Sequence, residues 1–168
     1  MLIEKVLEIC DRVMREAAEK KAGKGFPRST LEEGRDAVAG GQNTARRTQN
    51  IPTVLLVEDE AASLQNLSQA LRSWGCKVLP AASGHAAINI CEDYRGKIDV
   101  LVSKTAVGAV DGFELAAVAR LVHPHVIVLL ISESGAQRVA EGSGVDEFLE
   151  KPLKYEMLWK AIARRTGL

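Results

Sequence analysis

Beyond residue 51 the sequence alternates short, almost wholly apolar runs with longer segments, and this rhythm limits the fold more than any other feature. Runs of Val, Leu and Ile without a polar residue at every second position are typical of strands that are buried on both faces. Such strands belong to parallel sheets whose two faces are covered by helices. We therefore predict five strands, at residues 53–57, 77–79, 99–103, 126–131 and 147–149.

The segments between these runs have the periodicity of amphipathic helices. Residues 61–74, for example, place four large apolar side chains on one face of a helix. A strand followed by a helix, repeated five times with right-handed crossovers, gives an α/β domain with a doubly wound parallel sheet. Ligands of such sheets bind at the carboxyl ends of the strands. The other segments with helical spacing are residues 84–94, 112–121 and 155–165.

The first fifty residues differ in composition from the rest of the chain. Residues 2–21 carry an apolar stripe with helical spacing, whereas residues 23–50 are rich in Gly, Ser, Thr, Asn and Gln. We therefore predict an amphipathic helix at 1–22, a flexible linker at 23–50 and a globular domain at 51–168. The helix could pair two chains as a short coiled coil or pack on its own domain. Its stripe consists of Ile3, Val6, Cys10, Val13 and Ala17.

Charge and cysteine content narrow the class of protein. Lys and Arg number 22, as do Asp and Glu, so the formal net charge is zero and no overall field attracts nucleic acid or a membrane surface. The longest apolar run is too short to span a bilayer, and three widely spaced cysteines suit buried free thiols in a reducing compartment. We expect a cytoplasmic protein without nucleic-acid or membrane partners.

Four short motifs follow predicted strands in a fixed order. They are the run 54–60 with its acids Glu58 and Asp59, the pair Asp111-Gly112, Ser132, and the pair Lys151-Pro152. Through these motifs, residues 53–167 resemble the receiver domain of two-component response regulators. Each motif is weak alone, and the set of four is specific. The resemblance covers about two thirds of the chain.

The resemblance implies a flavodoxin-like fold with strand order 2-1-3-4-5. It also implies that acidic residues after the first strand and an aspartate after the third hold magnesium, and that this aspartate accepts a phosphoryl group. Ser132 and Lys151 stand where family members contact the phosphoryl group, and Phe148 stands near the switch aromatic.

Lysine occupies position 104, where the resemblance implies the phosphoacceptor aspartate. Residues 99–104 form a strand that ends at the pocket, and the pair Asp111-Gly112 downstream fixes the alignment. A phosphoacceptor is a nucleophilic carboxylate, which lysine cannot supply. The neighbouring segments have changed too, because Val107-Gly108 replaces the family's Met-Pro and residues 136–141 leave room for only a short fourth helix.

We expect the altered pocket to be a salt-bridge cluster in which two acids meet two bases, so that no metal and no cofactor are required. Glu58 and Asp59 remain weak metal candidates, because two carboxylates alone are an incomplete ligand shell. Alternatively, the Lys104 side chain extends into solvent. We also expect Ser132 to be an ordinary loop hydroxyl and Phe148 a fixed core residue. The predicted pocket consists of Glu58, Asp59, Lys104, Ser132 and Lys151.

These residues favour a phosphorylation-independent receiver-like domain, a pseudo-receiver, that serves as a protein-interaction module in bacterial two-component signal transduction and phosphorelay. The expected partner is a signalling protein such as a histidine kinase or a response regulator. No catalytic residue is predicted, because the sequence shows no nucleophile–base pair and no Gly-rich phosphate loop. Two alternatives stay open. One is a receiver phosphorylated on Asp59 or Asp99, and the other is a structural or oligomerisation subunit that uses the fold as a scaffold.

Overall fold

The fold is that of a computed structural model, which describes residues 51–133 and 143–168 together with six residues of the N-terminal stretch. Those six are helical and exposed. The stripe predicted within 2–21, the linker at 23–50 and the short helix at 136–141 lie outside the described residues, so they stay predictions. The six N-terminal residues are Glu4, Leu7, Glu8, Asp11, Arg12 and Arg15.

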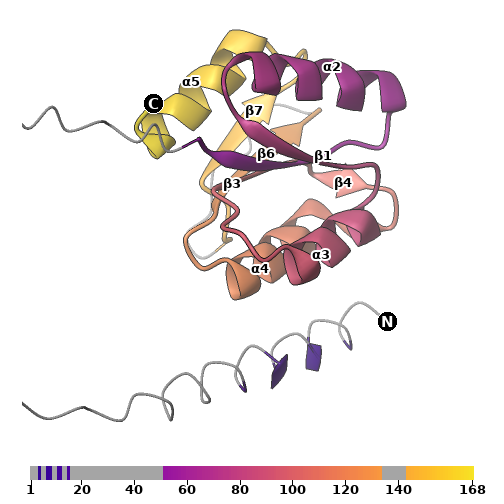
Figure 1. Cartoon of the computed structure of the whole chain (residues 1–168). Coiled ribbons are helices and arrows are strands. Elements are labelled where there is room, and N and C mark those ends of the chain that lie inside the picture. The colour runs from indigo at the N-terminus through magenta and orange to yellow at the C-terminus, as the bar shows by residue number, and fades with distance from the viewer. Residues whose placement is uncertain (1–3, 5–6, 9–10, 13–14, 16–50, 134–142) are drawn as a thin grey trace, which may run out of the picture.

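A parallel sheet of five strands, in the order β2-β1-β3-β6-β7, forms the centre of the domain (Figure 1). Counted along the chain, β6 and β7 are the fourth and fifth strands of this sheet, so the predicted flavodoxin-like order 2-1-3-4-5 is confirmed. The strands are β1 (Thr53–Val57), β2 (Lys77–Ala81), β3 (Val100–Lys104), β6 (Ile127–Ser132) and β7 (Glu147–Glu150).

Helices cover both faces of the sheet, as the two-sided burial of its strands requires. In Figure 1, α2 (Ala61–Ser73) and α5 (Tyr155–Thr166) lie on one face, and α3 (Gly84–Asp93) and α4 (Gly112–Val122) lie on the other. The α4 helix begins with a capping box, in which the Asp111 carboxylate accepts from the Phe113 N–H at 2.8 Å. Its start is therefore fixed by the same aspartate that marked the motif in the sequence.

The two faces have separate hydrophobic cores, and β1 supplies both by alternation. Val54 and Leu56 pack with α2 and α5, whereas Leu55 and Val57 pack with α3 and α4. Every residue of β1 is buried, and burying a side chain of this size contributes about 1.5–3 kcal/mol. Because both cores pack against the same strands, the carboxyl ends of these strands are held together at one edge of the sheet.

A small antiparallel hairpin follows β3 where the sequence predicted only a changed loop. Its strands are β4 (Ala106–Val107) and β5 (Val110–Asp111). Gly108 adopts φ of +64° in the turn between them, a conformation that favours glycine. Gly112 directly follows β5, and a Cβ at this position would lie 2.5 Å from the Lys104 carbonyl oxygen. The hairpin therefore folds back tightly against the end of β3, beside position 104.

Two of the three cysteines lie within the described residues. Cys76 and Cys91 are buried free thiols, as predicted, and Cys10 lies outside the described residues. Burial raises the pKa of the Cys91 thiol to about 12, so this thiol stays protonated and unreactive. Every helix within the part of the chain that the structure describes is too short or too polar to traverse a bilayer.

Candidate functional site

The acids and the lysine that the sequence singled out meet at the carboxyl edge of the sheet. Glu58 and Asp59 follow β1 directly, and Lys104 is the last residue of β3. These strands are neighbours with Val57 opposite Ser103, so their carboxyl ends are level. The pair of acids therefore faces the lysine across one strand spacing, which is the arrangement that the sequence predicted.

The Lys104 ammonium bridges the two carboxylates. Its Nζ atom lies 2.9 Å from Asp59 Oδ1 and 3.5 Å from Glu58 Oε1. The Lys104 side chain is only 18% exposed and that of Glu58 only 5%, whereas that of Asp59 is 45% exposed. Lys104 therefore lies in the pocket, and does not extend into solvent as the alternative interpretation held.

The hydrogen bond between Lys104 and Asp59 shifts the pKa of both groups in the direction that favours charge. It lowers the pKa of Asp59 below the ordinary value for aspartate. It also raises the pKa of Lys104, against the opposing effect of desolvation. A nucleophilic lysine needs a lowered pKa. Lys104 is therefore held as an ammonium ion, which suits an ion pair and not covalent chemistry.

Lys151 does not pair with Glu58 or Asp59, and the prediction of two acids against two bases is wrong in this respect. Its Nζ atom pairs with Glu133 Oε1 at 2.9 Å, and this contact lowers the pKa of Glu133. The physical reason is the sheet order, because β7 lies beside β6 and the Lys151 N–H donates to the Ser132 carbonyl at 3.0 Å. Lys151 is thus nearest to the carboxylate that follows β6.

Glu133 is the site residue that sequence reasoning missed. It directly follows Ser132 at the end of β6, so the rule that selected polar residues after strands would have found it. With Glu133 included, Lys104 and Lys151 face a larger number of carboxylates than the sequence analysis assumed. The edge therefore keeps a net negative charge.

The structure places both Ser132 and Phe148 in strands, at the end of β6 and within β7. Ser132 is the buried last residue of β6, 2% exposed, and not a loop residue, because the strand runs one residue beyond the apolar run. Phe148 is half-buried in β7, and its ring centroid lies 6.0 Å from that of Phe113 in α4. Whether Phe148 is fixed or moves as a switch stays a prediction.

The donor set at this edge does not fit the magnesium ion that the family resemblance implies. Magnesium requires near-octahedral oxygen ligands at about 2.0–2.1 Å. Here the Lys104 ammonium lies against Asp59 and Glu58, where a third oxygen ligand would have to stand. Among the described residues, no group of three or more His, Cys, Asp or Glu side chains is placed to hold a metal ion.

Asp99, one of the alternative phosphoacceptors, lies away from this pocket. It precedes β3 and therefore stands at the amino end of the strand that Lys104 ends. Its Oδ2 atom accepts a hydrogen bond from the Thr53 N–H at 2.9 Å, and its Oδ1 atom pairs with Lys97 at 2.5 Å. The Asp99 carboxylate thus ties β1 to β3 at the opposite edge of the sheet.

Comparison with known proteins identifies the family. The sequence matches the family model of the response regulator receiver domain over residues 54–163. The chain belongs to this family. It is 36% identical over 109 residues to the sensor kinase CckA of Brucella abortus, and 31% identical over 112 residues to the transcriptional regulatory protein GlrR of Escherichia coli. These matches cover 63% and 65% of this chain but 12% and 25% of the relatives, so this receiver spans a quarter of their length or less.

Solved receiver structures share the same fold. A receiver domain protein from Clostridium thermocellum superposes with a TM-score of 0.64 at 26% identity, covering 70% of this chain and 95% of that one. A receiver protein from Sinorhizobium medicae superposes with a TM-score of 0.63 at 29% identity, covering 71% and 98%. Both its sequence and its fold therefore identify this chain as a receiver domain of two-component systems.

Proposed function

We propose that this receiver works without phosphorylation, as a pseudo-receiver that serves as a protein-interaction module in two-component signalling. The observation that carries the proposal is the position of the Lys104 ammonium, 2.9 Å from Asp59 and 3.5 Å from Glu58. It lies at the end of the strand where the family resemblance implies the phosphoacceptor. The lysine removes the nucleophile and places a positive charge beside the acids.

Electrostatics support one fixed arrangement of this pocket. An ion pair about 4 Å apart gains roughly 4 kcal/mol at an effective dielectric near 20, before the cost of desolvation. Lys104 supplies this charge from within the chain, so the pair with Asp59 forms without an added ion. A pocket that needs neither metal nor phosphate has no chemical step by which to switch. The domain would then present the same surface to its partner at all times.

The proposed partner is a signalling protein such as a histidine kinase or a response regulator, and the proposed activity is binding and not catalysis. Similarity to a protein named as a sensor kinase supports a place in a kinase-containing pathway. Pairing of two chains through the predicted helix at 2–21 belongs to the same proposal, as does a cytoplasmic location. The proposed partner, pairing and location all rest on the proposal that this domain acts by binding another protein.

Phosphorylation by a small donor tests this proposal. The full chain is incubated with acetyl phosphate and magnesium, beside a receiver that carries the aspartate, and both are examined by intact-mass spectrometry. We expect the aspartate-bearing receiver to gain about 80 Da, the mass of a phosphoryl group, and this chain to gain nothing. An adduct on this chain that hydroxylamine removes would refute the proposal. The variants Asp59→Asn and Asp99→Asn would then locate the acceptor.

A further inference from the structure

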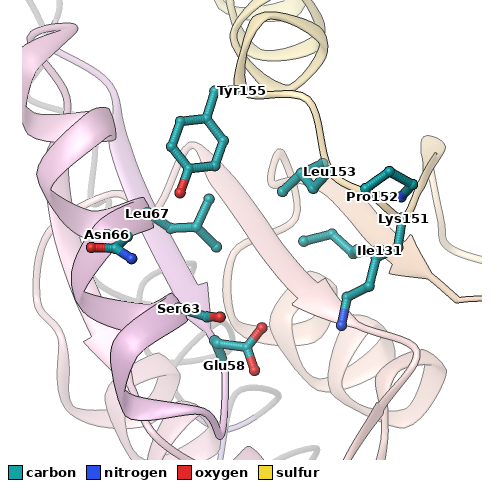
Figure 2. Close-up of a pocket in the computed structure, with 9 residues that line it drawn as sticks. All are labelled: Glu58, Ser63, Asn66, Leu67, Ile131, Lys151, Pro152, Leu153 and Tyr155. Carbon is teal, nitrogen blue, oxygen red and sulfur yellow. The ribbon is translucent and has the colours of Figure 1, made fainter.

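A pocket of about 290 Å³ opens between α2 and the segment that joins β7 to α5 (Figure 2). One wall carries Ser63, Asn66 and Leu67 of α2, and the facing wall carries Leu153 and Tyr155. The volume lies near the lower end of the range for small-molecule pockets, about 300–1,000 Å³. The pocket can therefore hold a small ligand or the end of one long side chain.

Glu58 brings a largely buried carboxylate to this pocket. The residue is 4% exposed and lines the cavity. Its Oε1 atom accepts a hydrogen bond from the Glu60 N–H at 3.1 Å and pairs with Lys104 at 3.5 Å. Within the described part of the chain, no group donates a hydrogen bond to Oε2. A donor that enters the pocket and reaches Oε2 would form a strong, charge-assisted hydrogen bond with this carboxylate.

The charges around the pocket favour a cation over an anion. Two ammonium groups, of Lys104 and Lys151, face a larger set of carboxylates. Lys151 also lines the pocket, and its ammonium is paired with Glu133 at 2.9 Å, so part of its charge is compensated. The acids of this edge are Glu58, Asp59, Glu60 and Glu133.

We propose that this pocket binds a primary ammonium or guanidinium group carried on a short aliphatic stem. The head donates to Glu58 Oε2, and the stem packs against Leu67 and Leu153. Asn66 and Tyr155 supply polar groups at the walls, and neither has a hydrogen-bond partner among the described residues. The ligand is either a free amine or the side chain of a lysine or arginine on a partner protein. This binding requires no phosphoryl group, because the ligand uses the Glu58 oxygen opposite the one that pairs with Lys104.

Titration of the isotope-labelled full chain with butylammonium, followed by two-dimensional NMR, tests the proposal. We expect saturable shifts of the backbone signals of Ser63, Asn66 and Leu153, with a Kd in the millimolar range for so small a ligand. Butylguanidinium should shift the same signals. Butyrate, which has an aliphatic stem but the opposite charge, should not. Equal shifts with butyrate, or no saturable shift with either cation, would overturn the proposal.

Charge variants on α2 provide the matched comparison. Asn66 is exposed and lines the pocket, whereas Gln65 is exposed and does not line it. Asn66→Lys places a competing ammonium at the pocket and should weaken butylammonium binding about tenfold or more. The control Gln65→Lys makes the same charge change away from the pocket and should leave the Kd unchanged within about twofold. Glu58→Gln should abolish binding. Equal weakening by both lysine variants would show a general charge effect and overturn the site.

A third ligand separates the two sources of the cation. Nα-acetyl-lysine methylamide carries the same ammonium on a protein-like backbone. If it binds more tightly than butylammonium, the pocket is a site for a lysine of a partner protein, and if it binds more weakly, the pocket is a site for a free amine. Failure of these titrations would leave the phosphorylation test untouched, since that test depends on Lys104 alone.

Discussion

The interior of the sheet and its carboxyl edge follow different rules. In the interior, the strands need only apolar side chains of suitable size, because hydrophobic stabilisation follows the area buried. At the edge, the identity of single residues decides the chemistry, and Lys104 changes it while the strands around it remain in register. The contrast shows that the receiver fold is kept with a lysine at position 104. Substitutions in the two regions should therefore have different consequences.

The largest effect is expected from a cavity in the interior. Leu101 is fully buried at the centre of β3, within the core on the α3 and α4 side. Leu101→Ala should lower the free energy of unfolding by about 2–5 kcal/mol, through lost burial and an unfilled cavity. Met157→Ala, at a position that is 51% exposed, should cost less than about 0.5 kcal/mol. Urea unfolding measures both, and a Leu101→Ala cost below that of Lys104→Ala would break the comparison.

An intermediate effect is expected from removing the lysine at the edge. Lys104→Ala leaves the buried Glu58 carboxylate without its ion pair and beside Asp59, which should cost about 1–3 kcal/mol. Lys151→Ala removes a lysine from the same edge, but its partner Glu133 is 70% exposed and water screens the pair, so the cost should be clearly smaller. Comparison of the two by urea unfolding is the measurement. Equal costs would mean that Lys104 is no better integrated than a surface lysine.

The smallest effect concerns pH. The lowered pKa of Asp59 makes its contribution fully present above the ordinary value of 3.8, and the contribution is lost as pH falls through the lowered pKa. The raised pKa of Lys104 makes its contribution fully present below 10.5, and it is lost as pH rises through the raised pKa. The stability advantage of the wild type over Lys104→Met should therefore be flat between these values and decline outside them.

This pH effect is small because the Asp59 side chain is 45% exposed and water screens the pair. Urea unfolding of both proteins over a series of pH values measures it. A difference between the two proteins that stays constant well below pH 3.8 would show that the ion pair with Asp59 contributes nothing.

Sequence reasoning succeeded where periodicity decides the structure. The bounds of β1 were predicted correctly and the end of α2 to within one residue, because a fully apolar run and a four-residue stripe each have one structural solution. The β4–β5 hairpin was missed, since strands of two residues have no periodicity to detect. At the edge, the meeting of Lys104 with Asp59 followed from strand order. The pairing of Lys151 did not, because a count of charges does not determine which carboxylate lies nearest.

Magnesium-dependent melting tests most directly whether Lys104 stands in for the divalent cation at the carboxyl edge. A ligand that binds the native state raises the melting temperature by mass action. Wild type and Lys104→Ala are melted with and without millimolar magnesium, with sodium chloride of equal ionic strength as the control. We expect no magnesium-dependent change for the wild type and a rise for Lys104→Ala, in which Glu58 and Asp59 lack their ammonium. A rise of equal size in both proteins would contradict the proposed role of Lys104.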